Sequence, residues 1–233
     1  MNTIHPTAFV GDEVNLGHGN VIGAYAVLLG PLHVGDGNWI GAQTVIGSPG
    51  EIRGIDHGDG AGAIGRGIRI GSGNVIREHV TIHQGHYART IIGDECYIMN
   101  RVYIGHDGEL ADRVTMASAV TLGGHVHVGA DANLGMGALV HQRRVIGPAT
   151  MIGMGAVVTR DVPPFAKAYG NPSRVRGANR VGMQRQGISE TTIQTLEEAY
   201  AMRGAAPAGV PPGLEAAWHW WRAETNRDDA DPG

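Results

Sequence analysis

Four of the chain's twelve histidines stand one to three residues after regularly spaced aliphatic residues: His83, His106, His125 and His141. Three of those aliphatic residues, Ile104, Leu122 and Val140, are 18 residues apart. An imidazole has a pKa of about 6.5, so it can take a proton from a hydroxyl or an amine near neutral pH. If 18 residues make one winding of the chain, the imidazoles stack on one face and can form a general acid–base centre.

Two other interpretations of these histidines stay open. Each imidazole can be an exposed side chain at a corner of the fold, although four histidines in one column make this interpretation less favourable. Zinc binding is the second, because histidine is a common zinc ligand. Prism-shaped carbonic anhydrases carry two histidines five residues apart and a third on a neighbouring coil, and no two histidines here have that spacing. We therefore expect acid–base catalysis and no bound metal.

Aliphatic residues recur every six positions along most of the chain. Each step is six from Ile4 to Ile46 and again from Ile92 to Val158, with glycine after many of them. An α-helix of about 3.6 residues per turn would spread this period around its whole surface. Three hexads, each a short strand and a corner where glycine accommodates positive φ, close a triangular coil, and coils stack about 4.8 Å apart. The sequence predicts an all-β fold, a parallel β-helix shaped as a triangular prism.

Two interruptions divide the repeat. Residues 49–66 are polar, rich in glycine and aperiodic, and they predict a projecting loop that either reaches over an active site or is disordered. The second interruption separates Ile82 from Ile92 by ten residues, so it inserts four. Subtracting these four places Ile82 on the same face as Ile104.

The remainder of the chain follows the prism. Two prolines, Pro163 and Pro164, are expected to end the ladder, which gives a β-helix domain over residues 1–164. A connecting segment over 165–188 lacks a clear period. Ser189 has the character of an N-cap and opens a helical extension over 189–225, and residues 226–233 are predicted to be a disordered tail.

Two glycines before His125 favour acyl transfer. The backbone at Gly124 lets a ligand approach closely, and an N–H there can donate to an oxyanion. No serine or cysteine nucleophile motif is evident, so direct attack of an acceptor on a thioester is the economical route. A prism offers no cleft of its own. We expect the site between neighbouring subunits of a three-fold assembly, with a monomeric prism as the alternative.

Several runs resemble one family, the acyl-carrier-protein-dependent UDP-N-acetylglucosamine O-acyltransferases that open lipid A synthesis. The resemblance covers nearly the whole chain. It rests on Ile4-His5-Pro6, Val80-Thr81-Ile82-His83-Gln84-Gly85, Ile104-Gly105-His106-Asp107, Leu122-Gly123-Gly124-His125, Val140-His141-Gln142, Asp161-Val162-Pro163-Pro164 and Gly170-Asn171. It implies a left-handed β-helix and a homotrimer with sites at subunit interfaces.

The resemblance also implies roles for residues. His106 would be the general base that deprotonates a sugar hydroxyl, Asp107 would orient it, and Gly124 N–H would stabilise the oxyanion. Adjacent strand residues point to opposite sides, so a corner is needed at Asp107. The remaining positions match substrate-binding residues, the last two at sites that hold nucleotide or carrier phosphates: His83, Tyr103, His125, His141, Gln142, Asn179 and Arg185.

Departures from the family concern the acceptor. Gly60 stands where a sugar-contacting lysine is usual, and Tyr103 where a further histidine is usual; Val181 and Gln186 replace an acidic residue and an arginine. The acceptor is therefore open: UDP-N-acetylglucosamine or another nucleotide-linked sugar, acylated on oxygen or nitrogen. Met154 falls where the family's acyl groove ends, and a side chain that fills this space predicts an acyl chain of medium length. Packing at a trimer seam is the alternative role of Met154.

Three rival functions remain. Gly170-Asn171-Pro172-Ser173 resembles the coenzyme-binding turn of acetyl-CoA-dependent sugar acetyltransferases. A zinc carbonic anhydrase and a non-catalytic scaffold are the others. For the favoured function we expect no bound cofactor. The expected co-substrate carries a medium-chain 3-hydroxyacyl group on the phosphopantetheine of acyl carrier protein, or is an acyl-CoA.

Composition limits the partners. The formal net charge is −4 with no basic run, which disfavours nucleic acid. No apolar run approaches the roughly 20 residues of a membrane span, and no signal peptide is visible. The single cysteine, Cys96, fits a reducing compartment, so we expect a cytoplasmic protein.

Overall fold

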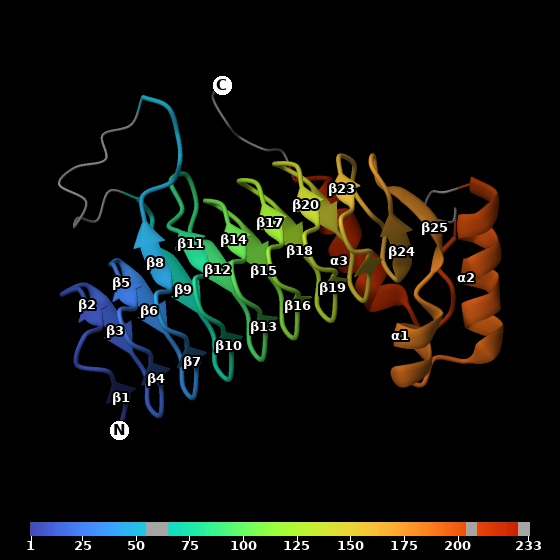
Figure 1. The fold of residues 1–233 in the computed structure, drawn as a ribbon. Coiled ribbons are helices and arrows are strands. Elements are labelled where there is room, and N and C mark those ends of the chain that lie inside the picture. The colour runs from blue at the N-terminus through green and yellow to red at the C-terminus, as the bar shows by residue number, and fades with distance from the viewer. Residues whose placement is uncertain (55–64, 204–208, 228–233) are drawn as a thin grey trace.

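The chain winds into a prism of stacked triangular coils, with helices at its C-terminal end (Figure 1). This computed structural model describes residues 1–54, 65–203 and 209–227. Three sheets form the sides of the prism, and their neighbouring strands are parallel up to β24. The predicted parallel β-helix is confirmed.

The strands of each sheet are short and come from successive coils. Face A contains β1 (Thr3–Ile4), β4 (Val21–Ile22), β7 (Trp39–Ile40), β10 (Val75–Ile76), β13 (Tyr97–Ile98), β16 (Thr115–Met116), β19 (Asn133–Leu134), β22 (Met151–Ile152), β24 (Ala166–Tyr169) and β25 (Arg174–Ala178). Face B contains β2 (Phe9–Val10), β5 (Val27–Leu28), β8 (Val45–Ser48), β11 (Thr81–His83), β14 (Tyr103–Ile104), β17 (Thr121–Leu122), β20 (Leu139–Val140) and β23 (Val157–Val158). Face C contains β3 (Val14–Leu16), β6 (Leu32–Val34), β9 (Ile68–Ile70), β12 (Thr90–Ile92), β15 (Glu109–Leu110), β18 (His127–Val128) and β21 (Val145–Ile146).

The register on face B matches the sequence arithmetic. Ile82 pairs with Ile104, Ile104 with Leu122, and Leu122 with Val140. The four inserted residues after Ile82 leave the ladder intact because they loop out between β11 and β12. The predicted spacing of 18 residues per coil is therefore confirmed for the coils that carry the histidines.

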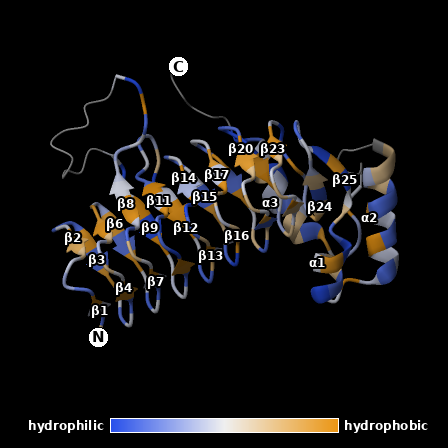
Figure 2. Cartoon of the chain, viewed as in Figure 1, coloured by the Kyte–Doolittle hydropathy of each residue, from blue (hydrophilic) through white to orange (hydrophobic). Residues whose placement is uncertain are grey.

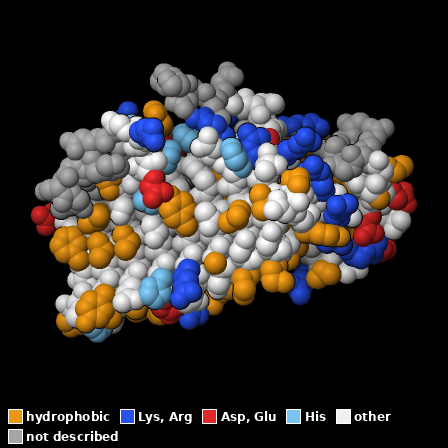
Figure 3. All heavy atoms as spheres, turned by 45° about the horizontal axis from the view of Figure 1, so that its top comes forward, with side chains coloured by type: hydrophobic (Ala, Val, Ile, Leu, Met, Phe, Trp, Pro, Cys, Tyr) orange, Lys and Arg blue, Asp and Glu red, His pale blue; other side chains and the backbone are white. Residues whose placement is uncertain are grey.

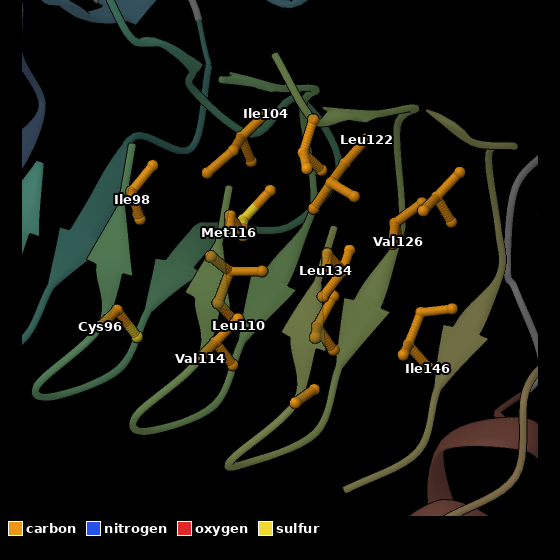
Figure 4. Close-up of a cluster of buried hydrophobic side chains, with 14 of the residues drawn as sticks. Cys96, Ile98, Ile104, Leu110, Val114, Met116, Leu122, Val126, Leu134 and Ile146 are labelled. Atoms are coloured by element: carbon orange, nitrogen blue, oxygen red, sulfur yellow. The ribbon is translucent and has the colours of Figure 1, made fainter. Parts of the chain in front are cut away.

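Aliphatic side chains fill the prism. The second residue of most two-residue strands points inward, as Ile98, Ile104 and Leu110 do in Figure 4, and each of these is 0–1% exposed. Hydrophobic colour follows the strands in Figure 2, with polar residues at many of the corners. Such burial of branched side chains in the coils that follow the first supplies the main driving force for folding.

The glycines that follow the aliphatic residues have a different role from the one expected. A Cβ on Gly23 would lie 2.7 Å from the Ala42 nitrogen, and one on Gly41 would lie 2.7 Å from the Glu78 nitrogen. These glycines are needed because successive coils approach closely. Positive φ occurs two residues later in the corner and is adopted by side chains such as Tyr25 (φ 56) and Gln43 (φ 57).

A buried ladder of asparagines links the first coils at the corner before face A. Asn38 is 1% exposed, and its amide nitrogen donates to Asn20 Oδ1 and Gly71 O, both at 3.0 Å. Its Oδ1 accepts from the backbone and side-chain nitrogens of Asn74, each at 2.9 Å. The side chain therefore satisfies polar groups of three coils.

Replacing Asn38 with alanine is expected to lower the free energy of unfolding by about 2–3 kcal/mol, because several buried donors and acceptors lose their partner. Urea denaturation measures this change. Asn15→Ala on the exposed side of face C is the matched control and should have little effect. An equal loss in both variants would contradict a role for the ladder.

The parallel ladder continues beyond the prolines that were expected to end it. Val162 forms a parallel bridge with Ile146, and β24 pairs in parallel with β22 before β25 reverses direction. Proline is tolerated here because Pro163 and Pro164 lie between the bridge and β24. The segment predicted to lack a period thus contains two strands and the short helix α1 (Arg180–Arg185).

Two further helices cover the end of the prism. In α2 (Glu190–Arg203), Ser189 Oγ accepts from Thr192 N–H at 3.2 Å, which confirms the predicted N-cap. In α3 (Glu215–Thr225), Trp218 stacks on Phe165 with ring centroids 6.1 Å apart. None of the helices in the described residues has the length and hydropathy to cross a bilayer. Most of the predicted loop 49–66 and of the predicted tail 226–233 lies outside the described residues.

Candidate functional site

The predicted histidines gather at the corners that lead from face B to face C. His83 ends β11, and His106, His125 and His141 follow β14, β17 and β20. The rings of His106 and His125 meet edge-on with centroids 5.2 Å apart. In Figure 3, histidine side chains lie on this side of the prism near a group of Lys and Arg side chains. The register and these contacts bring the column together.

His106 is held by its neighbour Asp107. The Nδ1 of His106 lies 2.6 Å from Asp107 Oδ2, and Asp107 has a φ of +58°. This positive φ turns the carboxylate back toward the imidazole, so the corner that the sequence required is present. Because the carboxylate accepts the Nδ1 proton, Nε2 of a neutral His106 carries the free lone pair.

Asp107 also organises the four-residue insertion. Its Oδ1 accepts the backbone N–H groups of three consecutive residues at 2.7–2.9 Å: His86, Tyr87 and Ala88. Burial acts to raise the pKa of Asp107, but the hydrogen bonds from His106 and Ala88 and the charges of His125 and His106 outweigh it and lower the pKa below its ordinary value of 3.8. The group is therefore an anion at neutral pH.

Asp107→Asn is expected to destabilise the fold by about 1–3 kcal/mol above pH 5, because hydrogen bonds to a buried charge are lost. A lowered pKa in the folded state gives stability that is present above the unfolded-state pKa and is lost as the pH falls through the folded-state pKa. The difference between wild type and variant should therefore shrink below about pH 4. Urea denaturation from pH 3 to 7 tests this, and a constant difference would contradict it.

Gly124 lies beneath the imidazole of His106. A Cβ on Gly124 would be 2.7 Å from His106 Nε2, so only glycine leaves room for the ring. The N–H of Gly124 makes no hydrogen bond to residues 1–54, 65–203 or 209–227. An available donor and the lone pair of a base therefore border the same space.

The other site residues differ in how closely they join this centre. His125 Nε2 lies 3.7 Å from Asp107 Oδ2, and His83 packs against Tyr103 with centroids 5.2 Å apart. His141 and Gln142 are exposed on the next coil.

Three predicted residues make no contact with the histidines within the described parts of the chain. Met154 is 76% exposed at a different corner, between faces A and B. Asn179 caps α1 through its Oδ1, which accepts from Gly182 N–H at 3.2 Å, and Arg185 is exposed at the end of the same helix. Gly60, where the family has a lysine, lies outside the described residues.

Two clusters place potential metal-ligand atoms within 4.8 Å of one another: His106, Asp107 and His125, and Glu109, His127 and Glu224. In the first, the carboxylate already accepts three N–H groups and the His106 proton. In the second, Arg227 lies 2.7 Å from Glu224 and 3.4 Å from Glu109. Hydrogen bonds and ion pairs satisfy both clusters, and the second ties α3 to β18 through a 2.6 Å contact of His127 with Glu224.

Sequence reasoning missed two contributors to the site. Tyr87 in the insertion stacks on His125 at 5.9 Å. Residues 49–51 cross the histidine column at the start of the first interruption. The sequence did contain a signal for both contributors, because each interruption of the six-residue repeat begins beside the face that carries the histidines.

The comparisons point to one family. A family model described as UDP-N-acetylglucosamine O-acyltransferase, domain 2, matches residues 161–203. The acyl-[acyl-carrier-protein]–UDP-N-acetylglucosamine O-acyltransferase of Pseudomonas savastanoi pv. phaseolicola is 44% identical over 134 residues, 56% of this chain and 52% of that protein. The chain thus spans about half the length of the curated relatives it matches.

Solved structures match over a longer stretch. LpxA from Acinetobacter baumannii is 30% identical, covers 90% of this chain and 84% of its own, and superposes with a TM-score of 0.73. The UDP-N-acetylglucosamine acyltransferase from Campylobacter jejuni is 27% identical, covers 85% of this chain and 81% of its own, and has the same TM-score of 0.73. Together with the parallel β-helix and the contacts among the histidines, these matches establish that the chain belongs to the UDP-N-acetylglucosamine acyltransferase family.

Proposed function

We propose that this protein transfers an acyl group from the thioester of acyl carrier protein to a hydroxyl of a nucleotide-linked sugar. The relatives' names specify acyl carrier protein and UDP-N-acetylglucosamine. The observation that carries the proposal is the pairing of His106 with Asp107 beside the backbone N–H of Gly124. A base next to an oxyanion donor is what direct acyl transfer requires.

The proposed reaction uses His106 twice. Nε2 takes the proton of the acceptor hydroxyl while its oxygen attacks the thioester carbonyl, and Gly124 N–H donates to the developing oxyanion. Collapse of the intermediate breaks the C–S bond, and His106 returns the proton to the departing thiolate. Asp107 holds the ring and stabilises the imidazolium, since its carboxylate is ionised.

The outer faces of the prism support a trimer. Outward residues on faces A and B are largely apolar, for example Trp39 and Tyr97 on face A and Phe9 and Leu139 on face B. Face C carries polar outward residues and is partly covered by α3. Two apolar faces per prism suit a closed ring of three copies, in which the exposed Arg185 of one copy reaches the site of a neighbour.

Charge is distributed unevenly along the chain. Residues 141–189 contain eight Lys and Arg residues and one acidic residue, although the whole chain has a net charge of −4. Five of these basic residues are exposed: Arg160, Lys167, Arg174, Arg176 and Arg185. A basic surface near the site favours binding of an anionic acyl donor. Its positive potential also raises the rate at which such a donor associates with the protein.

A donor comparison tests the proposal. Purified protein is incubated with a sugar nucleotide and with 3-hydroxyacyl carrier protein, the matching acyl-CoA or acetyl-CoA, and release of the free thiol is followed. We expect turnover with the carrier thioester to exceed that with both coenzyme donors. Preference for acetyl-CoA would instead support the rival acetyltransferase, and turnover lost on metal removal would support a metal enzyme.

Met154→Gly is expected to shift the donor preference toward longer acyl chains. Met136 and Met154 occupy the same corner in successive coils, with exposed fractions of 55% and 76%. Removing one side chain frees space for several methylenes, each worth about 0.8 kcal/mol when buried. We expect at least about a tenfold gain in kcat/KM for chains two to four carbons longer. Carrier thioesters of graded length measure it, and an unchanged preference would refute Met154 as the ruler.

A further inference from the structure

The insertion between β11 and β12 joins the histidine column through a closed set of contacts. Its backbone is fixed by Asp107, whose Oδ1 accepts the N–H of Tyr87 at 2.9 Å. The ring of Tyr87 stacks on His125, with centroids 5.9 Å apart and an interplanar angle of 29°. His125 in turn approaches the same carboxylate, because its Nε2 lies 3.7 Å from Asp107 Oδ2. One buried anion therefore fixes the insertion, and the insertion contacts an imidazole beside that anion.

Two imidazoles lie next to one carboxylate oxygen. His106 Nδ1 is 2.6 Å from Asp107 Oδ2, and this hydrogen bond leaves Nε2 of His106 as the base. His125 Nε2, at 3.7 Å, is outside hydrogen-bonding distance of the same oxygen. The Asp107 side chain is 0% exposed, so solvent screens its attraction for a nearby N–H group only weakly. A shift of about 1 Å or less would make His125 a competitor for the oxygen that orients His106.

Tyr87 is placed to prevent this shift. Its side chain is 42% exposed, so the hydrophobic core does not require an aromatic ring at this position. His86 packs edge-on against the ring with centroids 4.7 Å apart, and Asp107 Oδ1 holds the backbone N–H groups of both residues. Stacked aromatic rings favour a particular relative position. The phenol ring therefore supports one side of His125 from a fixed backbone.

We propose that Tyr87 is a positioning residue that keeps His125 beyond hydrogen-bonding distance of Asp107 Oδ2. That oxygen then remains the acceptor for His106 Nδ1, and Nε2 of His106 stays directed at the acceptor hydroxyl. This inference rests on the proposed function. Tyr87 acts through His125, and the stacking requires its ring and not its hydroxyl group.

The first test compares Tyr87→Ala with Tyr87→Phe. Loss of the ring is expected to lower kcat for acyl transfer by about 10- to 100-fold, because a displacement of about 1 Å at a reacting group costs on the order of 10²-fold in rate. KM for both substrates should change little, and Tyr87→Phe should keep the wild-type kcat. Tyr25→Ala, the same change at a tyrosine that is 62% exposed on the second coil, should also keep it. Full activity of Tyr87→Ala, or an equal loss in Tyr87→Phe, would overturn the proposal.

A double-mutant cycle tests whether Tyr87 acts through His125. In a His125→Ala background, replacing Tyr87 with alanine should lower kcat by no more than about twofold further, because the imidazole that the ring restrains is gone. If the two losses multiplied instead, the side chains would act independently, and Tyr87 would not be a positioning residue for His125.

A crystal structure of Tyr87→Ala separates this inference from the proposed function, because it needs no turnover. We expect His125 Nε2 within about 3.2 Å of Asp107 Oδ2, and a longer contact of His106 Nδ1 with that oxygen. Distances unchanged from wild type would contradict the inference at any level of activity. The expected movement of both rings, in a protein whose wild type transfers no acyl group, would refute the proposed function alone.

Discussion

Replacing His106 with alanine is expected to lower kcat for acyl transfer by about 10²- to 10⁴-fold, the range typical of a lost general base. The variant retains Gly124 N–H and the binding surfaces, so KM for both substrates should change little. The imidazole lies at a surface corner, and its removal leaves Asp107 still bound by three backbone N–H groups. Steady-state thiol release with the carrier thioester measures the effect.

The matched control for this change is His33→Ala, because His33 is also exposed and lies on the outer side of face C. It should retain wild-type turnover. Both variants should keep the oligomeric mass of the wild type in native mass spectrometry. Retention of more than about a tenth of kcat by His106→Ala would contradict its role as the base. A parallel loss of the assembly would mean that the defect is structural.

Replacing Gly124 with alanine is expected to lower kcat by about 10²-fold or more. The new Cβ would lie 2.7 Å from His106 Nε2 and 2.8 Å from its Cε1, so the ring must move. A displacement of about 1 Å at a reacting group costs on the order of 10²-fold in rate. The proposed oxyanion donor, the N–H of Gly124, would shift with the ring, because the two groups lie against each other.

Gly108→Ala provides the comparison for this effect. Gly108 lies in the corner that holds His106, but a Cβ there would contact Val126 O at 3.3 Å and no imidazole. This variant should keep turnover within a fewfold of wild type, and both glycine variants should melt within a few degrees of it. If Gly124→Ala retained full activity, the close packing of backbone and base would have no catalytic importance.

The repeat made most of the fold predictable, because the number of residues per coil is set by strand and corner geometry and not by distant contacts. Ile82, Ile104, Leu122 and Val140 therefore pair as the spacing required, despite a four-residue insertion. The same arithmetic placed the histidines on one side. The continuation of the ladder through β24 was missed because prolines signal an end only when they fall within a paired strand.

Details of the candidate site depended on contacts that spacing does not encode. The positive φ of Asp107 turns its carboxylate onto His106, whereas strand alternation alone would separate them. The contact of Tyr103 with Glu51 joins residues 52 positions apart through an aperiodic segment. Sequence patterns locate regular elements, and irregular segments carry much of what selects a substrate.

The mass of the product tests most directly whether His106 catalyses acyl transfer to the nucleotide sugar. Wild type and His106→Ala are each incubated with 3-hydroxyacyl carrier protein and UDP-N-acetylglucosamine, and the nucleotide sugar is analysed by mass spectrometry. We predict a species heavier than the acceptor by one 3-hydroxy acid less one water, formed by wild type and nearly absent with His106→Ala. An unmodified acceptor with wild type, or equal acylation by both proteins, would contradict it.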